Sequence, residues 1–88
     1  MDKATFKAIV EAIVSGFEDP DFQAKFAAAR AQGDVAAMMA LPGEIQTQAF
    51  ARSGLEAASA VGAFKEAGRS FGADSDVAPL LARMKAAL

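Results

Sequence analysis

The chain has 88 residues, a formal net charge of −2, and neither cysteine nor histidine. Disulfides are therefore excluded, and the Cys and His ligand sets of structural zinc sites cannot be assembled. The nine Lys and Arg residues are scattered singly along the sequence, whereas nucleic-acid binding requires a clustered basic face. We expect one domain over residues 1–88 with no nucleic-acid partner.

The start of the sequence leads directly into an amphipathic pattern instead of a basic region followed by an apolar run. We therefore expect no secretory signal. No uncharged apolar stretch reaches the roughly 18 residues that a membrane-spanning helix needs, so no membrane span is expected. The lack of cysteine is compatible with a reducing compartment. The sequence thus predicts an alanine-rich cytoplasmic protein.

The first predicted helix follows Asp2, because an aspartate at this position accepts hydrogen bonds from the exposed amides of a helix start. Large apolar residues then recur at helical steps, whereas the alternation typical of a strand is absent. Gly16 and the run 18–21 end the helix. The apolar stripe consists of Phe6, Ile9, Val10, Ile13, Val14 and Phe17.

Asp19-Pro20 starts a second predicted helix, since aspartate caps the first amides and proline is pre-set for the first helical position. Phe22, Phe26 and Ala29 form its inner edge. Gly33 is a natural C-terminal stop. Asp34 then caps a short third helix, which Leu41-Pro42-Gly43 is expected to break. Its apolar residues are Val35, Met38, Met39 and Leu41.

The segment from Glu44 to Phe71 contains no proline and is rich in alanine. We expect one long helix there, about 42 Å at 1.5 Å per residue. A break near Ser53-Gly54 remains an alternative, because glycine disfavours a helix interior. After Gly72, the run 74–76 is expected to cap a last helix with an apolar stripe. The predicted fold is all-α, a small bundle of four to five helices whose last stripe is Val77, Leu80, Leu81, Met84 and Leu88.

Seven residues of the predicted long helix recur at alternating steps of four and three, the spacing of a coiled-coil heptad. Large aromatic residues alternate there with small ones, and small residues allow two helix backbones to approach closely. We call these residues the seam: Phe50, Gly54, Ala57, Val61, Phe64, Gly68 and Phe71.

Two interpretations of the seam remain open. It is either the spine of the domain's own core or, in part, an interface with another chain. A helix near 40 Å is long for a domain whose radius of gyration should be about 12 Å. This length favours an interface, so the seam is the candidate site for a second copy or a partner helix.

Catalytic chemistry finds little support in the sequence. Nucleophilic catalysis requires a nucleophile beside a base. Lys7 and Ser15 are eight residues apart, and no motif surrounds them. The acidic residues of the run 18–21 lack the spacing of a calcium-binding loop and are better explained by helix capping. We expect no catalytic residue, no cofactor and no metal.

Two functional hypotheses follow. The first is a non-catalytic interaction or assembly module that forms a homo-oligomer or binds a partner helix. The alternative is a small helical bundle that binds an apolar small molecule between its helices, where Ala57, Ala58 and Gly62 leave room. Met38 and Met39 are able to line an adaptable groove, but a core position is the more common role for such residues.

Overall fold

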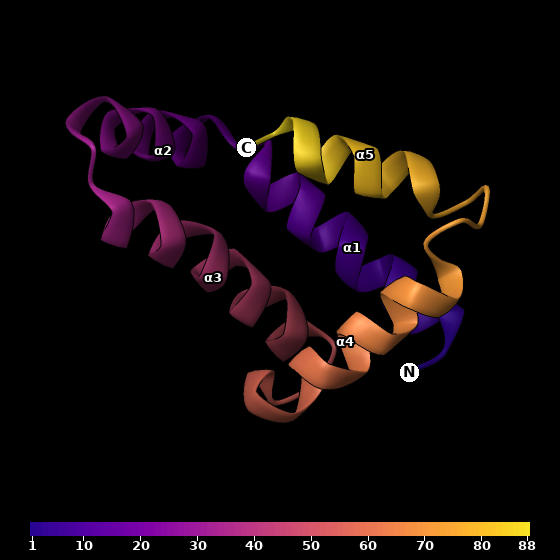
Figure 1. Ribbon diagram of the computed structural model, residues 1–88. Coiled ribbons are helices and arrows are strands. Elements are labelled where there is room, and N and C mark those ends of the chain that lie inside the picture. Colours follow the sequence, from indigo (N-terminus) through magenta and orange to yellow (C-terminus); the bar gives the residue numbers. More distant parts are fainter.

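The computed structural model describes all residues from Met1 to Leu88 and contains helices but no strand (Figure 1). The prediction of a small all-α bundle is confirmed. The helices are α1 (Lys3–Phe17), α2 (Pro20–Gln32), α3 (Val35–Arg52), α4 (Ala57–Phe71) and α5 (Ala78–Ala86).

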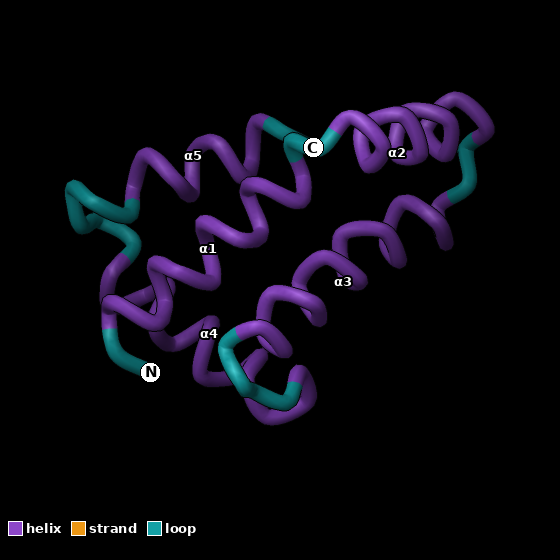
Figure 2. The backbone as a smooth tube through the Cα atoms, turned by 180° about the vertical axis from the view of Figure 1, so that it is seen from behind, coloured by secondary structure: helices purple, strands orange, loops and turns teal.

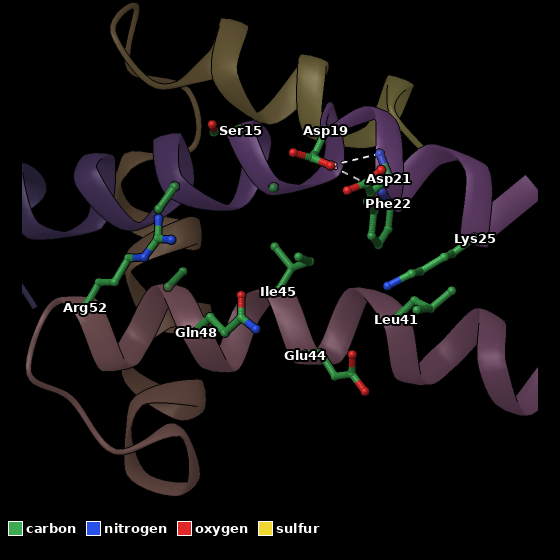
Figure 3. Close-up of a pocket in the computed structure, with 13 residues that line it drawn as sticks. Ser15, Asp19, Asp21, Phe22, Lys25, Leu41, Glu44, Ile45, Gln48 and Arg52 are labelled. Carbon is green, nitrogen blue, oxygen red and sulfur yellow. Dashed lines mark hydrogen bonds between the residues drawn. The ribbon is translucent and has the colours of Figure 1, made fainter.

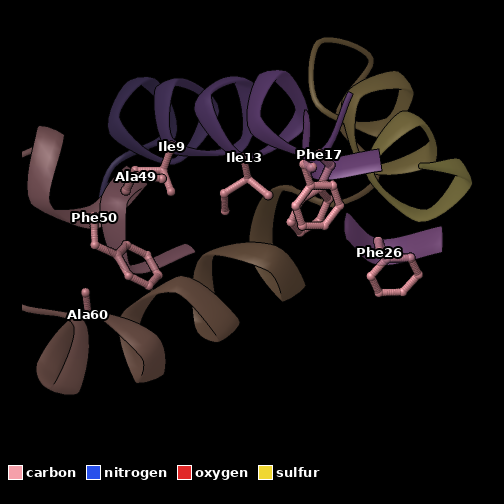
Figure 4. Packing of buried hydrophobic residues seen from close by; sticks show 8 residues of the cluster. Ile9, Ile13, Phe17, Phe26, Ala49, Phe50 and Ala60 are labelled. Atoms are coloured by element: carbon pink, nitrogen blue, oxygen red, sulfur yellow. The ribbon is translucent and has the colours of Figure 1, made fainter. Parts of the chain in front are cut away.

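Helix α1 is the central element, and it contacts each of the other four helices. Its six predicted apolar positions are all buried, none more than 2% exposed. Ile9, Ile13 and Phe17 pack with residues of α2, α3 and α4, as Figure 4 shows. Phe6 and Val10 belong to a second cluster on the side of α4 and α5. One helix therefore divides the core into two parts.

Three predicted N-caps are confirmed. The carboxylate of Asp2 accepts a hydrogen bond from the Thr5 amide at 2.8 Å. Asp19 accepts one from the Asp21 amide at 2.9 Å, and Asp34 accepts one from the Ala37 amide at 3.1 Å. Each cap satisfies an amide that has no partner within its helix.

The predicted break at Leu41-Pro42-Gly43 is wrong, because α3 continues through Pro42 to Arg52. Proline removes one backbone hydrogen bond from a helix interior. Packing compensates, since α3 has a continuous inward stripe on both sides of the proline. The stripe comprises Met38, Leu41, Ile45 and Ala49, all of which pack in the cluster of Ile9, Ile13 and Phe17.

The predicted long helix from residue 44 to 71 is also wrong, and the alternative break near Ser53-Gly54 is confirmed. Gly54 adopts a left-handed conformation with φ of 75°. The Leu55 and Gly54 amides donate to the carbonyls of Phe50 and Ala51, both at 3.0 Å. This pattern is a Schellman motif, in which glycine ends a helix without steric strain. Two helices, α3 and α4, therefore replace the single one.

The start of the last helix differs from the prediction as well. Helix α5 begins at Ala78, and no side chain caps its first turn. The Asp74 carboxylate instead accepts a hydrogen bond from the Asp76 amide at 2.9 Å within the preceding turn. Both acids also lie near Lys3, at 2.9 Å from Asp74 and 3.1 Å from Asp76. The acidic run therefore attaches this turn to the start of α1.

Figure 2 shows that α2 and the N-terminal half of α3 extend away from the other three helices. The radius of gyration is 13.2 Å and the principal extents are 39 × 26 × 19 Å, so the molecule is more elongated than a globular domain of its length, for which about 12 Å is typical. We call the projecting part, residues 20–43, the arm.

Candidate functional site

The aromatic residues of the seam lie inside this chain. Phe64 and Phe71 pack on the ring of Phe6, with centroid distances of 5.0 and 6.1 Å. Phe50 meets Phe64 edge-on at 5.4 Å. A Cβ placed on Gly68 would lie 3.9 Å from the Phe6 ring. This part of the seam forms core contacts between α1, α3 and α4.

The other seam residues do not continue that surface. Gly54 lies in the exposed turn between α3 and α4, and Ala57 is half-buried at the start of α4. Val61 is 40% exposed. The seven seam residues therefore do not form one continuous outer face. The turn at Gly54 reverses the chain between Phe50, the first of them, and Ala57, the third. An interface role for the seam stays a prediction, and only its exposed members are free to make such a contact.

A cleft of about 360 Å³ lies between α1, α2 and α3. Its floor is formed by small and apolar residues, which include Gly16, Phe22, Ile45 and Ala49. Its rim carries charges of both signs, and Figure 3 shows Lys25 and Arg52 near opposite ends. The expected pocket residues Ala57, Ala58 and Gly62 do not line it. The remaining lining residues are Ala12, Ser15, Asp19, Asp21, Leu41, Glu44 and Gln48.

One of the acidic groups of this cleft is engaged in helix capping. Asp19 is occupied in capping α2, where it accepts bonds from the amides of Asp21 and Phe22. No buried side-chain nitrogen or oxygen atom anywhere in the chain lacks a hydrogen-bond partner. No group of three or more acidic side chains is placed to hold a metal ion.

Ion pairs join α1 to the region of α5 at both ends of α1. The carboxylates of Asp74 and Asp76 raise the pKa of Lys3. The Asp76 amide, followed by Lys3, lowers the pKa of Asp74. At the other end, Glu18 binds Arg83 at 2.6 Å and raises its pKa. These groups are exposed, so they orient α5 and contribute little to stability.

The N-terminal half of α3 presents an apolar face that no other element of the chain covers. Residues 35–43 carry no charge. Val35 is 64% exposed and Met39 is 74% exposed, the two highest values among the large apolar side chains. Gly43 lies on the same side, where a Cβ would have no neighbour within 4 Å. We call Val35, Met39 and Gly43 the open face.

Sequence reasoning did not identify the open face. It expected Val35, Met38, Met39 and Leu41 to share the stripe of one short helix. Met38 and Leu41 pack against the core, while Val35 and Met39 are exposed. The sequence feature that indicates the open face is the absence of charge over nine consecutive residues, 35–43.

No protein-family model, characterised protein or solved structure matches the chain. None of the five helices has both the length and the apolar character that crossing a bilayer requires.

Proposed function

We propose that the protein is a non-catalytic interaction or assembly module, which self-associates or binds a partner helix through the open face of α3. The observation that carries this proposal is the exposure of Val35 and Met39 within an uncharged helical segment. An apolar helix face of this kind is the usual counterpart of a partner helix or groove.

Burial of the open face would stabilise a complex. Complete burial of a valine or methionine side chain contributes about 1.5–3 kcal/mol. Val35 and Met39 keep 64% and 74% of their surface exposed, so each has most of that contribution still available to a partner. The neighbouring Ala36 and Ala40 are exposed too, and their small side chains let a partner backbone approach closely.

Binding of an apolar small molecule has less support. The cleft between α1, α2 and α3 has the volume of a small ligand site, about 360 Å³, and such sites typically measure about 300–1,000 Å³. Its rim, however, carries Asp21, Lys25, Glu44 and Arg52, and burying these charges beside an apolar ligand would be costly.

Site-specific photo-cross-linking tests the proposal. A photoreactive amino acid is placed at position 39 on the open face, and a matched one at position 85, an exposed lysine of α5. Irradiation in the producing cells should link position 39 to one protein, either a second copy or a partner. Position 85 should give no such product.

The product is identified by mass spectrometry and its binding is reconstituted with purified protein. Met39→Lys should weaken the reconstituted binding at least tenfold, because it places a charge in the apolar contact. Lys85→Ala should leave binding unchanged. Absence of any protein product from position 39, or an unchanged affinity in Met39→Lys, would exclude the proposal.

A further inference from the structure

We infer that the occupant of the open face is a second copy of this chain, bound by antiparallel packing of two α3 helices about a two-fold axis at Met39. This inference rests on the proposed function and specifies its partner. The symmetry makes both chains use the same surface.

The geometry of α3 places the open face on one side of the helix. At 3.6 residues per turn, Val35 and Gly43 lie about 40° to either side of Met39 around the helix axis. Glu44 and Gln48 lie on the opposite side, where they line the cleft. The open face therefore has no charge that would oppose the approach of an identical helix.

The same side of α3 is already a helix-packing surface further along the chain. Phe50 lies only about 20° from Met39 in helical projection, and it is 2% exposed because α4 packs on it. Besides its inward stripe, α3 thus has a second side, which α4 covers at the C-terminal end and which is uncovered in the arm. A second α3 would extend this existing interface.

The open face is complementary to itself. When two α3 helices run antiparallel with Met39 facing Met39, Val35 of each chain lies opposite Gly43 of the other. A branched side chain then meets a residue without one, which allows close packing. No contact inside the chain requires a glycine at position 43, and its φ is not positive. Glycine is otherwise unfavourable in a helix interior. The contact with Val35 of the other chain therefore explains why residue 43 is a glycine.

The partner's α4 does not obstruct this arrangement. Phe50, where α4 covers α3, lies about 16 Å along the helix from Met39, and Gly33 at the arm tip lies about 9 Å away in the other direction. The point where the partner's α4 covers Phe50 therefore lies about 7 Å beyond the tip of the arm.

The size of the open face indicates a weak dimer. A standard interface buries about 800 Å² on each partner. The open face has only two large apolar side chains, Val35 and Met39, so we expect a weaker association than that of a standard interface, with dissociation constants of about 10–100 μM.

Sedimentation velocity of the purified chain tests the inference over a concentration range that spans those constants. The wild type should change from monomer to dimer as concentration rises. Met39→Lys and Met39→Glu should each remain monomeric, with dissociation constants at least tenfold higher. An equimolar mixture of the two should recover the dimer, because only an axis at Met39 brings residue 39 of each chain together.

Two further variants test the packing and the axis. Gly43→Leu should weaken association at least tenfold while the monomer stays fully helical, because the side chain meets only open space within its own chain. Met39→Cys should oxidise rapidly to a covalent dimer, since helices about 8–10 Å apart bring facing Cα atoms within disulfide reach. The chain has no cysteine of its own, and Lys85→Cys is the matched control.

A wild-type chain that stays monomeric throughout would overturn the inference. In that case, a cross-link from position 39 to a different protein preserves the proposed function, whereas no cross-link removes both. A dimer that the mixture of charged variants does not restore, or that cross-links equally through position 85, would place the interface elsewhere and also overturn the inference.

Discussion

Gly16 should be a position where alanine destabilises the protein although it favours the helix. A Cβ placed on Gly16 would lie 2.6 Å from Cγ2 and 3.1 Å from Cδ1 of Ile45, closer than packed side chains permit. Such overpacking commonly costs about 1–3 kcal/mol, whereas replacing a helical glycine by alanine contributes about 1 kcal/mol. We expect Gly16→Ala to lower the free energy of unfolding by about 1 kcal/mol.

Removing the Ile45 side chain should turn the effect of Gly16→Ala on the free energy of unfolding from a loss into a gain. In an Ile45→Ala background the added methyl group meets no Cγ2 or Cδ1, so Gly16→Ala should raise stability by about 0.5–1 kcal/mol through helix propensity alone. The coupling between the two positions would then be about 1.5–2 kcal/mol, within the range for residues in contact. Urea unfolding followed by far-ultraviolet circular dichroism measures all four proteins of the cycle.

Gly62 is the matched control for this experiment. It lies inside α4, and a Cβ there has no neighbour within 4 Å. Gly62→Ala should therefore raise stability by about 1 kcal/mol in either background. If Gly16→Ala were stabilising in the wild-type background to the same extent as Gly62→Ala, the close approach of α1 and α3 at Ile45 would be refuted.

The remaining predictions concern the turns and caps. Gly54→Ala should lower stability by about 1–2 kcal/mol in urea unfolding, because φ of 75° is unfavourable for an L residue with a side chain. Asp19→Ala should cost about 0.5–2 kcal/mol through loss of the cap, and a melting temperature that rises with added Ca²⁺ only in the wild type would contradict the capping role. The lowered pKa of Asp74 means that its contribution is present above its ordinary pKa and is lost as pH falls through the lowered one. The stability difference between wild type and Asp74→Asn, measured by urea unfolding, should therefore be constant near neutral pH and vanish in acid, and its persistence there would contradict the assignment.

The helical stripe of α1 was predictable because all of its members are buried together. Phe6 and Phe17, at its two ends, are 0% and 1% exposed. A helix that is surrounded by four others must be apolar over a wide angle, and this leaves an unambiguous period in the sequence. The caps at Asp2, Asp19 and Asp34 were predictable for a related reason, since capping depends on residues that are close in sequence.

The two glycine-containing pairs at which a break was considered show why local sequence signals did not predict where α3 ends. Pro42-Gly43 and Ser53-Gly54 both contain glycine, yet only the second ends a helix. The inward stripe continues through the first pair, so tertiary packing outweighs the missing hydrogen bond at proline. After the second pair, Leu55 packs in the same cluster as Phe50, which supports the Schellman turn. These contacts are not visible in a local pattern.

The seam illustrates a limit of periodicity itself. Phe50 and Phe64 are 14 positions apart, which would separate them by about 21 Å in one continuous helix. Their ring centroids are 5.4 Å apart instead. The same alternating spacing is compatible with a long helix and with two helices that fold back on each other through a common face. The spacing identifies the packing face, but it does not state what packs on it.

The turn at Gly54 also determines why the open face exists. Had the helix continued past residue 53, α4 would extend away from Phe50 and leave that side chain without its present cover. Because the chain reverses, α4 covers the C-terminal end of α3, but α4 has only 15 residues and runs on toward α1 and α5. No other helix of the chain covers the face of α3 at Val35 and Met39. The residue that ends α3 thus decides which part of this side of the helix is covered within the chain and which part stays exposed.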